Sequence, residues 1–203
     1  MTILSKKTDQ SGRSMVEMLG VLAIIGVLSV GGISGYSKAM AKFKLTKAQD
    51  QITMLLMNIR TAYATSPSYK DLSAATAIAY NLAPNEMSTG SGATKLYGTF
   101  GGEVLVGTVG AGSNYFYIQL TDLGKEACRS LLTSDWGADG LVRIDAGPSS
   151  KLTPDDAHAS CNSSSIPTEY GAGTWCTAKL PVKLADAAFA CSNEVNYIQW
   201  VYY

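Results

Sequence analysis

The residues with the clearest capacity for chemistry are four cysteines in the C-terminal part of the chain. They are Cys128, Cys161, Cys176 and Cys191. No Cys-x-x-Cys or His-x-x-x-His spacing accompanies them, and the single histidine, His158, lies in a Ser/Asp-rich stretch, so the sequence offers no zinc site. The expected chemistry is disulfide formation, which persists outside the cytoplasm. Four cysteines allow three pairings.

The motifs of common catalytic and nucleotide-binding sites are missing. The chain contains no Walker loop, no complete Gly-x-Gly-x-x-Gly and no Gly-x-Ser-x-Gly. Asp135, Asp139 and Gly140 have oxygens that could bind calcium, but their spacing differs from that of a calcium-binding loop. We therefore expect neither enzyme activity nor a metal or organic cofactor.

A further chemical feature is one carboxylate inside an apolar segment. Residues 15–33 read MVEMLGVLAIIGVLSVGGI, and their only charge is Glu17. The run is long enough to span the hydrocarbon core of a bilayer. A charge in a spanning helix costs about 2.5–3.5 kcal/mol and is usually functional. Alternatively, Glu17 lies at the headgroup boundary, where the cost is small.

The charges on either side of the run bear on its orientation. The polar head before it is positive, which tends to keep the head cytoplasmic and to send the following chain across the membrane. Four lysines just beyond the run weaken this signal; they are Lys38, Lys42, Lys44 and Lys47. The cysteines favour the periplasm or the exterior for the following chain.

Three interpretations of the N-terminal segment compete. A secretory signal peptide could be cleaved after residues 39–41, which read Ala-Met-Ala. A plain single-span anchor would stay uncut. The third interpretation rests on Gly12 and Arg13, which precede Glu17 and the apolar run. This arrangement resembles the leader of type IV prepilins, which is cleaved after such a glycine on the cytoplasmic side of the membrane.

The resemblance implies roles for these residues. Cleavage would remove residues 1–12 and leave Arg13 as the N-methylated first residue, where the family more often has Phe, Met or Leu. Glu17 would then pair with the N-terminal amine of a neighbouring subunit. The implied partners are other copies of the chain in a helical filament, a prepilin peptidase, an inner-membrane assembly platform and, before assembly, membrane lipid.

The periodicity predicts that the apolar helix continues beyond the membrane. Apolar residues at i, i+3, i+4, i+7 and i+11 form one face: Ile52, Leu55, Leu56, Ile59 and Tyr63. We predict one helix over residues 13–63, about 75 Å long. Residues 13–35 form its hydrophobic half and residues 36–65 its amphipathic half. Gly31 and Gly35 are either a close-packing seam or a point where the helix unwinds.

Residues 66–203 are expected to form a globular α+β head on an antiparallel sheet. The predicted strands are 95–100, 103–109, 114–120, 141–144, 177–182 and 196–203, and the predicted helices are 73–82 and 122–134. Thr121 or Asp122 is expected to cap the second helix. Residues 146–173 are predicted to be a loop. The aromatic last strand is either core packing or an adhesive surface.

Residues 120–144 carry a second resemblance. A strand, a helix with Cys128 (LTDLGKEACRSLLTS), a Gly-rich turn and the strand LVRI resemble type IVb pilins of the toxin-coregulated-pilus type. This resemblance implies a disulfide from Cys128 to Cys191, near the C-terminus. Cys161 and Cys176 would then form a local bridge across the Ser/Pro/Gly-rich loop. The 12-residue leader is shorter than is usual for this subclass.

The composition excludes several classes of protein. Sixteen basic residues balance sixteen acidic ones, which argues against a nucleic-acid-binding surface, and a single long apolar stretch excludes a polytopic membrane protein. We predict a structural subunit, a major pilin of a type IVb-like pilus. It would lie in the bacterial inner membrane with its head in the periplasm before joining an extracellular filament for adhesion, aggregation or DNA transfer. The alternatives are a pseudopilin of a type II secretion system and a monomeric, membrane-anchored periplasmic binding domain.

Overall fold

The computed structural model describes residues 15–88, 92–109, 114–137, 139–148, 175–177 and 179–203. The chain divides into two compact units, residues 1–42 and 43–203. Helix α1 (Met15–Tyr63) begins in the first unit and ends in the second. The helix predicted over residues 13–63 is therefore confirmed, although residues 13 and 14 lie outside the described residues.

The first unit contains the apolar part of α1. Residues 15–39 are all exposed, and no charge interrupts the sequence from residue 18 to residue 37. The helix is continuous through Gly31, Gly32 and Gly35, and a Cβ atom at any of these positions would meet nothing within 4 Å. Since each glycine costs about 1 kcal/mol relative to alanine, this part of the helix is less stable than its length suggests.

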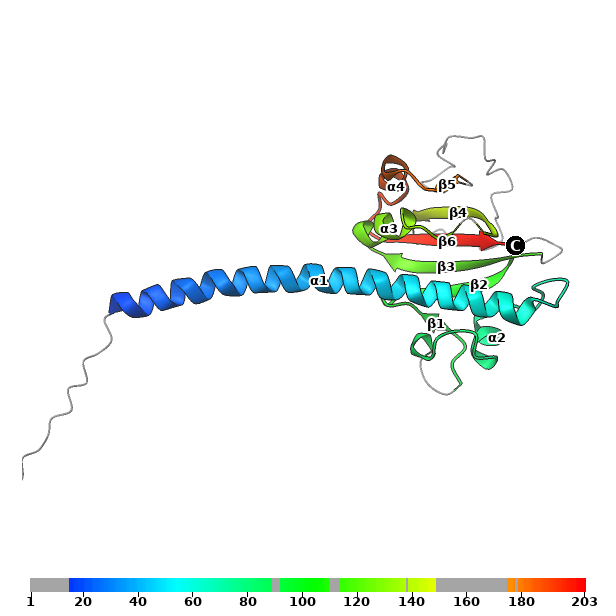
Figure 1. Ribbon diagram of the computed structural model, residues 1–203, viewed down its shortest axis with the longest axis horizontal. Helices are drawn as coiled ribbons and strands as arrows, with labels where there is room; N and C mark the ends of the chain where they lie inside the picture. Colours follow the sequence, from blue (N-terminus) through cyan, green and yellow to red (C-terminus); the bar gives the residue numbers. More distant parts are fainter. Residues whose placement is uncertain (1–14, 89–91, 110–113, 138, 149–174, 178) are drawn as a thin grey trace, which may run out of the picture. The chain divides into compact units, whose positions relative to one another are not determined.

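The second unit packs the amphipathic part of α1 against a sheet (Figure 1). The buried face of the helix follows the spacing expected from the sequence and consists of Ala48, Gln51, Ile52, Leu55, Leu56 and Ile59. Arg60 lies in the last turn, where a cation interacts favourably with the helix dipole. The stripe is confirmed as the surface that attaches this part of the helix to the head.

The sheet has six strands in the order β1-β2-β3-β6-β4-β5, and every pair is antiparallel. The strands are β1 (Leu96–Tyr97), β2 (Glu103–Val109), β3 (Tyr115–Leu123), β4 (Leu141–Pro148), β5 (Trp175–Thr177) and β6 (Asn196–Tyr202). The last strand in the sequence therefore lies between β3 and β4. The predicted α+β class with an antiparallel sheet is confirmed.

Short helices complete the second unit. They are α2 (Ala74–Ala79), the 3-10 helix η1 (Asn85–Met87), α3 (Lys125–Leu132) and α4 (Leu184–Ala190). Helix α2 begins where the sequence predicts, because the Ser73 hydroxyl accepts a hydrogen bond from the Thr76 amide. Helix α4 has no counterpart among the elements expected from the sequence.

The cap predicted for the cysteine-bearing helix is wrong. Strand β3 continues to Leu123 through an irregularity after Leu120, so α3 starts only at Lys125, with Gly124 as an N-cap that has no side-chain bond. The Thr121 hydroxyl donates instead to the Glu103 carbonyl of β2, at 2.9 Å. Thr121, which local preference would place at the start of a helix, is therefore used for a contact between two strands.

Three strand boundaries also differ from expectation. Strand β1 stops at Tyr97 because Gly98 starts a turn, in which its amide donates to the Gly102 carbonyl. Strand β4 extends to Pro148 because it stays paired with β6 to that residue. The strand expected over 177–182 is wrong: β5 ends at Thr177, whose hydroxyl accepts from the Lys179 amide and turns the chain.

The main core lies on the side of the sheet that faces α1. In the last strand Ile198, Trp200 and Tyr202 belong to this core, whereas Val201 joins a smaller cluster that includes Tyr117. Burial raises the pKa of Tyr202, while Arg60, 5.3 Å above its ring, opposes that rise. The aromatic residues of β6 are therefore core packing, and the adjacent Tyr203 is the exposed one.

Two neighbouring residues of α1 test how the helix is held. Leu55 is fully buried, whereas Met54 is 53% exposed. We expect Leu55→Ala to lower the free energy of unfolding by about 2–5 kcal/mol, because it leaves a cavity. Met54→Ala should change it by no more than about 0.5 kcal/mol. Urea unfolding of the full chain in detergent micelles, followed by tryptophan fluorescence, measures both; equal losses would contradict the packing described here.

Candidate assembly site

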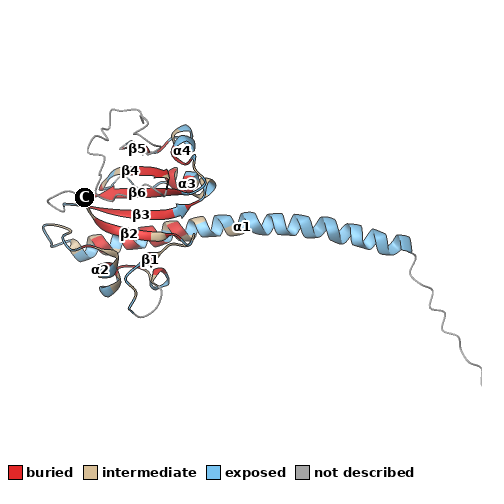
Figure 2. Cartoon of the chain, turned by 180° about the vertical axis from the view of Figure 1, so that it is seen from behind, coloured by how far each residue is buried: buried red, intermediate tan, exposed pale blue. Residues whose placement is uncertain are grey.

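The first part of α1 presents large apolar side chains on all sides. Thirteen of them are exposed: Met15, Val16, Met18, Leu19, Val21, Leu22, Ile24, Ile25, Val27, Leu28, Val30, Ile33 and Tyr36. Figure 2 shows this part of the helix in pale blue, the colour of exposed residues. Among the described residues, α1 is the one helix long and apolar enough to cross a membrane. A surface of this kind requires an apolar environment.

Two charges delimit the long uncharged part of this surface, residues 18–37. Glu17 lies in the first turn of the described helix, and the next charged residue along the chain is Lys38. At 1.5 Å per residue the two are about 31 Å apart along the helix, close to the thickness of a hydrocarbon core. Gly12 and Arg13, the other residues implicated by the sequence, lie outside the described residues.

A polar network fixes the second part of α1 on the head. Gln51 is almost fully buried; its amide nitrogen donates to Glu86 Oε1 at 2.7 Å, and its amide oxygen accepts from Thr99 Oγ1 at 2.7 Å. Lys47 Nζ lies 2.8 Å from Glu86 Oε2. The bond from Lys47, and then that from Gln51, lowers the pKa of Glu86. Sequence reasoning missed this network, because its members are far apart in the chain.

Other polar side chains of α1 also bind the head. Asn58 Nδ2 donates to the Leu82 carbonyl at 2.7 Å. Arg60 Nη2 donates to the Asp139 carbonyl at 2.8 Å, and a Cβ atom at Gly140 would collide with the same guanidinium group. Of the residues considered for calcium, Asp139 therefore binds Arg60 through its backbone carbonyl. In the described part of the chain, no three His, Cys, Asp or Glu side chains gather as a metal site.

A disulfide joins α3 to the end of α4. Cys128 and Cys191 are both fully buried, and their Cα atoms are 5.8 Å apart. This is the bridge that the type IVb resemblance implied. Cys176 is also disulfide-bonded. Its expected partner, Cys161, lies outside the described residues, as does His158, so the Cys161–Cys176 bridge stays a prediction.

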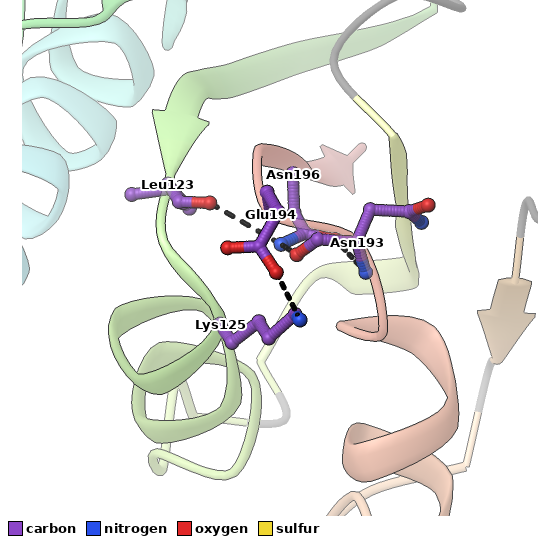
Figure 3. A network of polar contacts seen from close by, with 5 residues as sticks. All are labelled: Leu123, Lys125, Asn193, Glu194 and Asn196. Atoms are coloured by element: carbon purple, nitrogen blue, oxygen red, sulfur yellow. Dashed lines mark hydrogen bonds and ion pairs between the residues drawn. The ribbon is translucent and has the colours of Figure 1, made fainter.

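Polar contacts join the end of β3 and the start of α3 to the turn before β6 (Figure 3). The buried Asn196 donates through Nδ2 to the Leu123 carbonyl at 3.2 Å and to the Asn193 carbonyl at 2.7 Å. Lys125 forms an ion pair with Glu194 and lowers the pKa of that carboxyl. The end of β3, the start of α3 and the turn before β6 are thereby held together.

The PilS N-terminal family model matches residues 43–202, which is more than half of the chain. The chain belongs to the PilS family of type IVb pilins. The matched segment begins at the first residue of the second unit, so the family signal comes from the head and the part of α1 packed on it. Residues 15–42, which include the exposed apolar part of α1, lie outside that match.

Sequence similarity to individual pilins supports this assignment. The major structural subunit of the bundle-forming pilus of Escherichia coli O111:H- is 27% identical over 94% of this chain and 92% of its own length. The toxin coregulated pilin of Vibrio cholerae serotype O1 is 27% identical over 64% of this chain and 59% of its own. These relatives are structural subunits, and the pilin family is not a family of enzymes.

A solved structure has the same fold. The type IVb pilin from Salmonella typhi superposes with a TM-score of 0.52, covering 78% of this chain and 97% of its own, at 19% sequence identity. At that identity the likeness concerns the fold. This pilin therefore shares the architecture of that structure, although most of its side chains differ.

The disulfide should dominate the stability of the C-terminal part of this pilin. Replacing both Cys128 and Cys191 by Ala opens a loop that spans 63 positions. On the chain-entropy model this costs about 4 kcal/mol. Lys125→Ala, which removes only the exposed ion pair with Glu194, should change stability little. Urea unfolding without reductant compares the two; a double-alanine variant as stable as the wild type would contradict the prediction.

Proposed function

We propose that this chain is a major structural subunit of a type IVb-like pilus. Its apolar helix holds it in the bacterial inner membrane with the head in the periplasm, and the same helix then packs against other copies in a surface filament. The observation that carries the proposal is the apolar surface of residues 15–36, exposed on every side. The family assignment and the two named relatives, both pilins, support it.

The exposed helix needs an apolar partner before and after assembly. Lipid tails supply it in the membrane, and the corresponding helices of neighbouring subunits supply it in a filament. Because both environments are apolar, transfer from one to the other involves no large change in hydrophobic free energy, and packing decides the preference. A membrane-bound subunit can therefore join a filament without exposing the helix to water.

Glu17 makes the filament the more favourable of the two environments. An unpaired carboxylate is costly in a medium of low dielectric constant. In a filament, Glu17 would pair with the positively charged N-terminal amine of a neighbouring subunit, which offsets that cost. Because one amine meets one carboxylate, the same pair would fix the axial offset between subunits.

Such a pair requires a new N-terminus close to Glu17. Cleavage after Gly12 by a prepilin peptidase would place the amine on Arg13, four residues from Glu17, and methylation would follow there. An inner-membrane assembly platform would then extract the subunit. The filament would serve adhesion, aggregation or DNA transfer, and imaging of surface filaments in a strain that lacks only this protein tests whether the chain builds it.

Processing can be tested by intact mass. The mature protein should lack residues 1–12, begin at Arg13 and carry one added methyl group. Gly12→Val should leave residues 1–12 attached, because it alters the residue before the scissile bond. Gly20→Val, a matched change inside the apolar run, should be processed normally. A wild-type chain that begins at Lys42 would establish a signal peptide instead.

Assembly can be tested through Glu17. We expect Glu17→Gln, which keeps the shape of the side chain but removes its charge, to abolish filaments or reduce them at least about tenfold. Membrane insertion should be unimpaired, because removal of a charge makes insertion easier. Lys38→Gln removes the charge at the other end of the apolar run and should leave assembly intact. Electron microscopy and fractionation measure both outcomes; abundant filaments from Glu17→Gln would contradict the proposed role.

A further inference from the structure

An open hollow of about 530 Å³ lies on the head beside the C-terminal end of α1. Its lining comes from α1, from the segment that follows it and from α2: Tyr63, Lys70, Asp71, Ala75, Thr76, Ala79 and Tyr80. Figure 1 shows α2 next to this end of α1. All of these residues belong to the second unit, and none of them takes part in the assembly site described above.

One aromatic wall of the hollow is held in place by the core. The ring of Tyr63 lies 5.4 Å from that of Tyr69, which in turn lies 4.5 Å from the ring of the fully buried Phe116. Tyr63 is therefore fixed before any ligand arrives. Preorganisation of this kind lowers the entropic cost of binding.

Helix α2 and its C-cap residue, Tyr80, also line the hollow. Tyr80 is 72% exposed, although its backbone is fixed by a 3.0 Å bond from its amide to the Thr76 carbonyl. Ala75 and Ala79 are four residues apart on the same helix and also line the hollow, where their small side chains occupy little space. Two tyrosines, Tyr63 and Tyr80, therefore line the open hollow.

Two opposite charges, Lys70 and Asp71, also line the hollow. Lys70 and Asp71 are both exposed, and neither forms an ion pair with another described residue. The backbone of Asp71 is left-handed, with a φ of 68°, and its carbonyl accepts a 2.8 Å bond from the Thr76 hydroxyl. Burial, and then the Asp71 carboxylate, raises the pKa of Tyr63 above its ordinary value. Like any tyrosine hydroxyl, this group is protonated at neutral pH and can donate.

This combination favours a neutral ligand rich in hydroxyl groups. An organic cation would be attracted to Asp71 and the rings but repelled by Lys70, and an anion would meet the reverse. A hydroxyl group can donate to the carboxylate and accept from the ammonium group at the same time. An apolar C–H face can lie on an aromatic ring. We propose that the hollow binds a single neutral saccharide unit between Tyr63 and Tyr80, hydrogen-bonded to Lys70 and Asp71.

An open hollow buries only part of such a ligand, so one site should bind weakly, with a Kd on the order of 1 mM. If the chain forms filaments, each subunit repeats the site, and binding to a surface with many saccharides gains about 10²–10⁴ in avidity. This gain rests on the proposed function, whereas the site itself does not.

Saturation-transfer NMR on the monomeric full chain in detergent micelles tests the site. The probes are the methyl glycosides of glucose, galactose, mannose and N-acetylglucosamine. At least one should receive saturation. Tyr80→Ala should weaken its binding by about tenfold or more, and Asp71→Asn by several-fold; Asn tolerates the left-handed backbone. Tyr203→Ala, which removes an exposed tyrosine elsewhere on the head, should have no effect.

Several results would overturn the proposal. They are the absence of saturation transfer to all four glycosides, equal binding by the wild type and Tyr80→Ala, or binding only of a charged probe such as tetramethylammonium or sialic acid. Because the test uses monomers, it is separate from the test of assembly. Glycoside binding by a chain that forms no filaments would contradict the proposed function and leave the saccharide site standing. Filaments formed by a chain that binds no glycoside would contradict the saccharide site and leave the proposed function standing.

Discussion

The structure of this pilin depends on how the apolar surface of α1 is buried. The helix carries two different patterns in one continuous element: residues 15–36 are apolar on every side, and residues 48–59 have a single apolar stripe. A stripe can be covered by one sheet, and the head covers it. A helix that is apolar all round needs an apolar environment on every side, and residues 15–39 are all exposed.

The sheet of the head is completed by its last strand. Strand β6 lies between β3 and β4, so the sheet is incomplete until the end of the chain is in place. The turn that leads into β6 is held by the Cys128–Cys191 disulfide and by Asn196, which binds both the end of β3 and its own turn. These contacts lower the entropic cost of placing a strand whose partners are far away in the sequence.

The sequence predicted what depends on local pattern or on covalent chemistry. The length of α1 and the apolar residues of its stripe followed from periodicity, and strand β2 from its β-branched residues. The cap of α3 could not be predicted, because Thr121 gives its hydroxyl to a carbonyl on a neighbouring strand. Strand β5 was misplaced for a similar reason: the 177–182 stretch has the composition of a strand, but the Thr177 hydroxyl accepts from the Lys179 amide and the strand ends. Helix α4 is different, because its alanine-rich sequence favours a helix and local composition indicates it. The site residues Gln51, Glu86 and Thr99 meet only in the folded chain.

Apolar burial alone leaves the axial position of α1 on the sheet poorly determined. An amphipathic stripe repeats approximately every turn, so a shift of the helix by about 5.4 Å would place similar side chains against the same core. The bonds of Gln51 to Glu86 and Thr99 do not repeat in this way, and a shift would leave a buried amide without partners, which costs about 1–3 kcal/mol. The polar network therefore sets the register that the stripe leaves open. The head is thereby fixed in register on the part of α1 that belongs to the second unit.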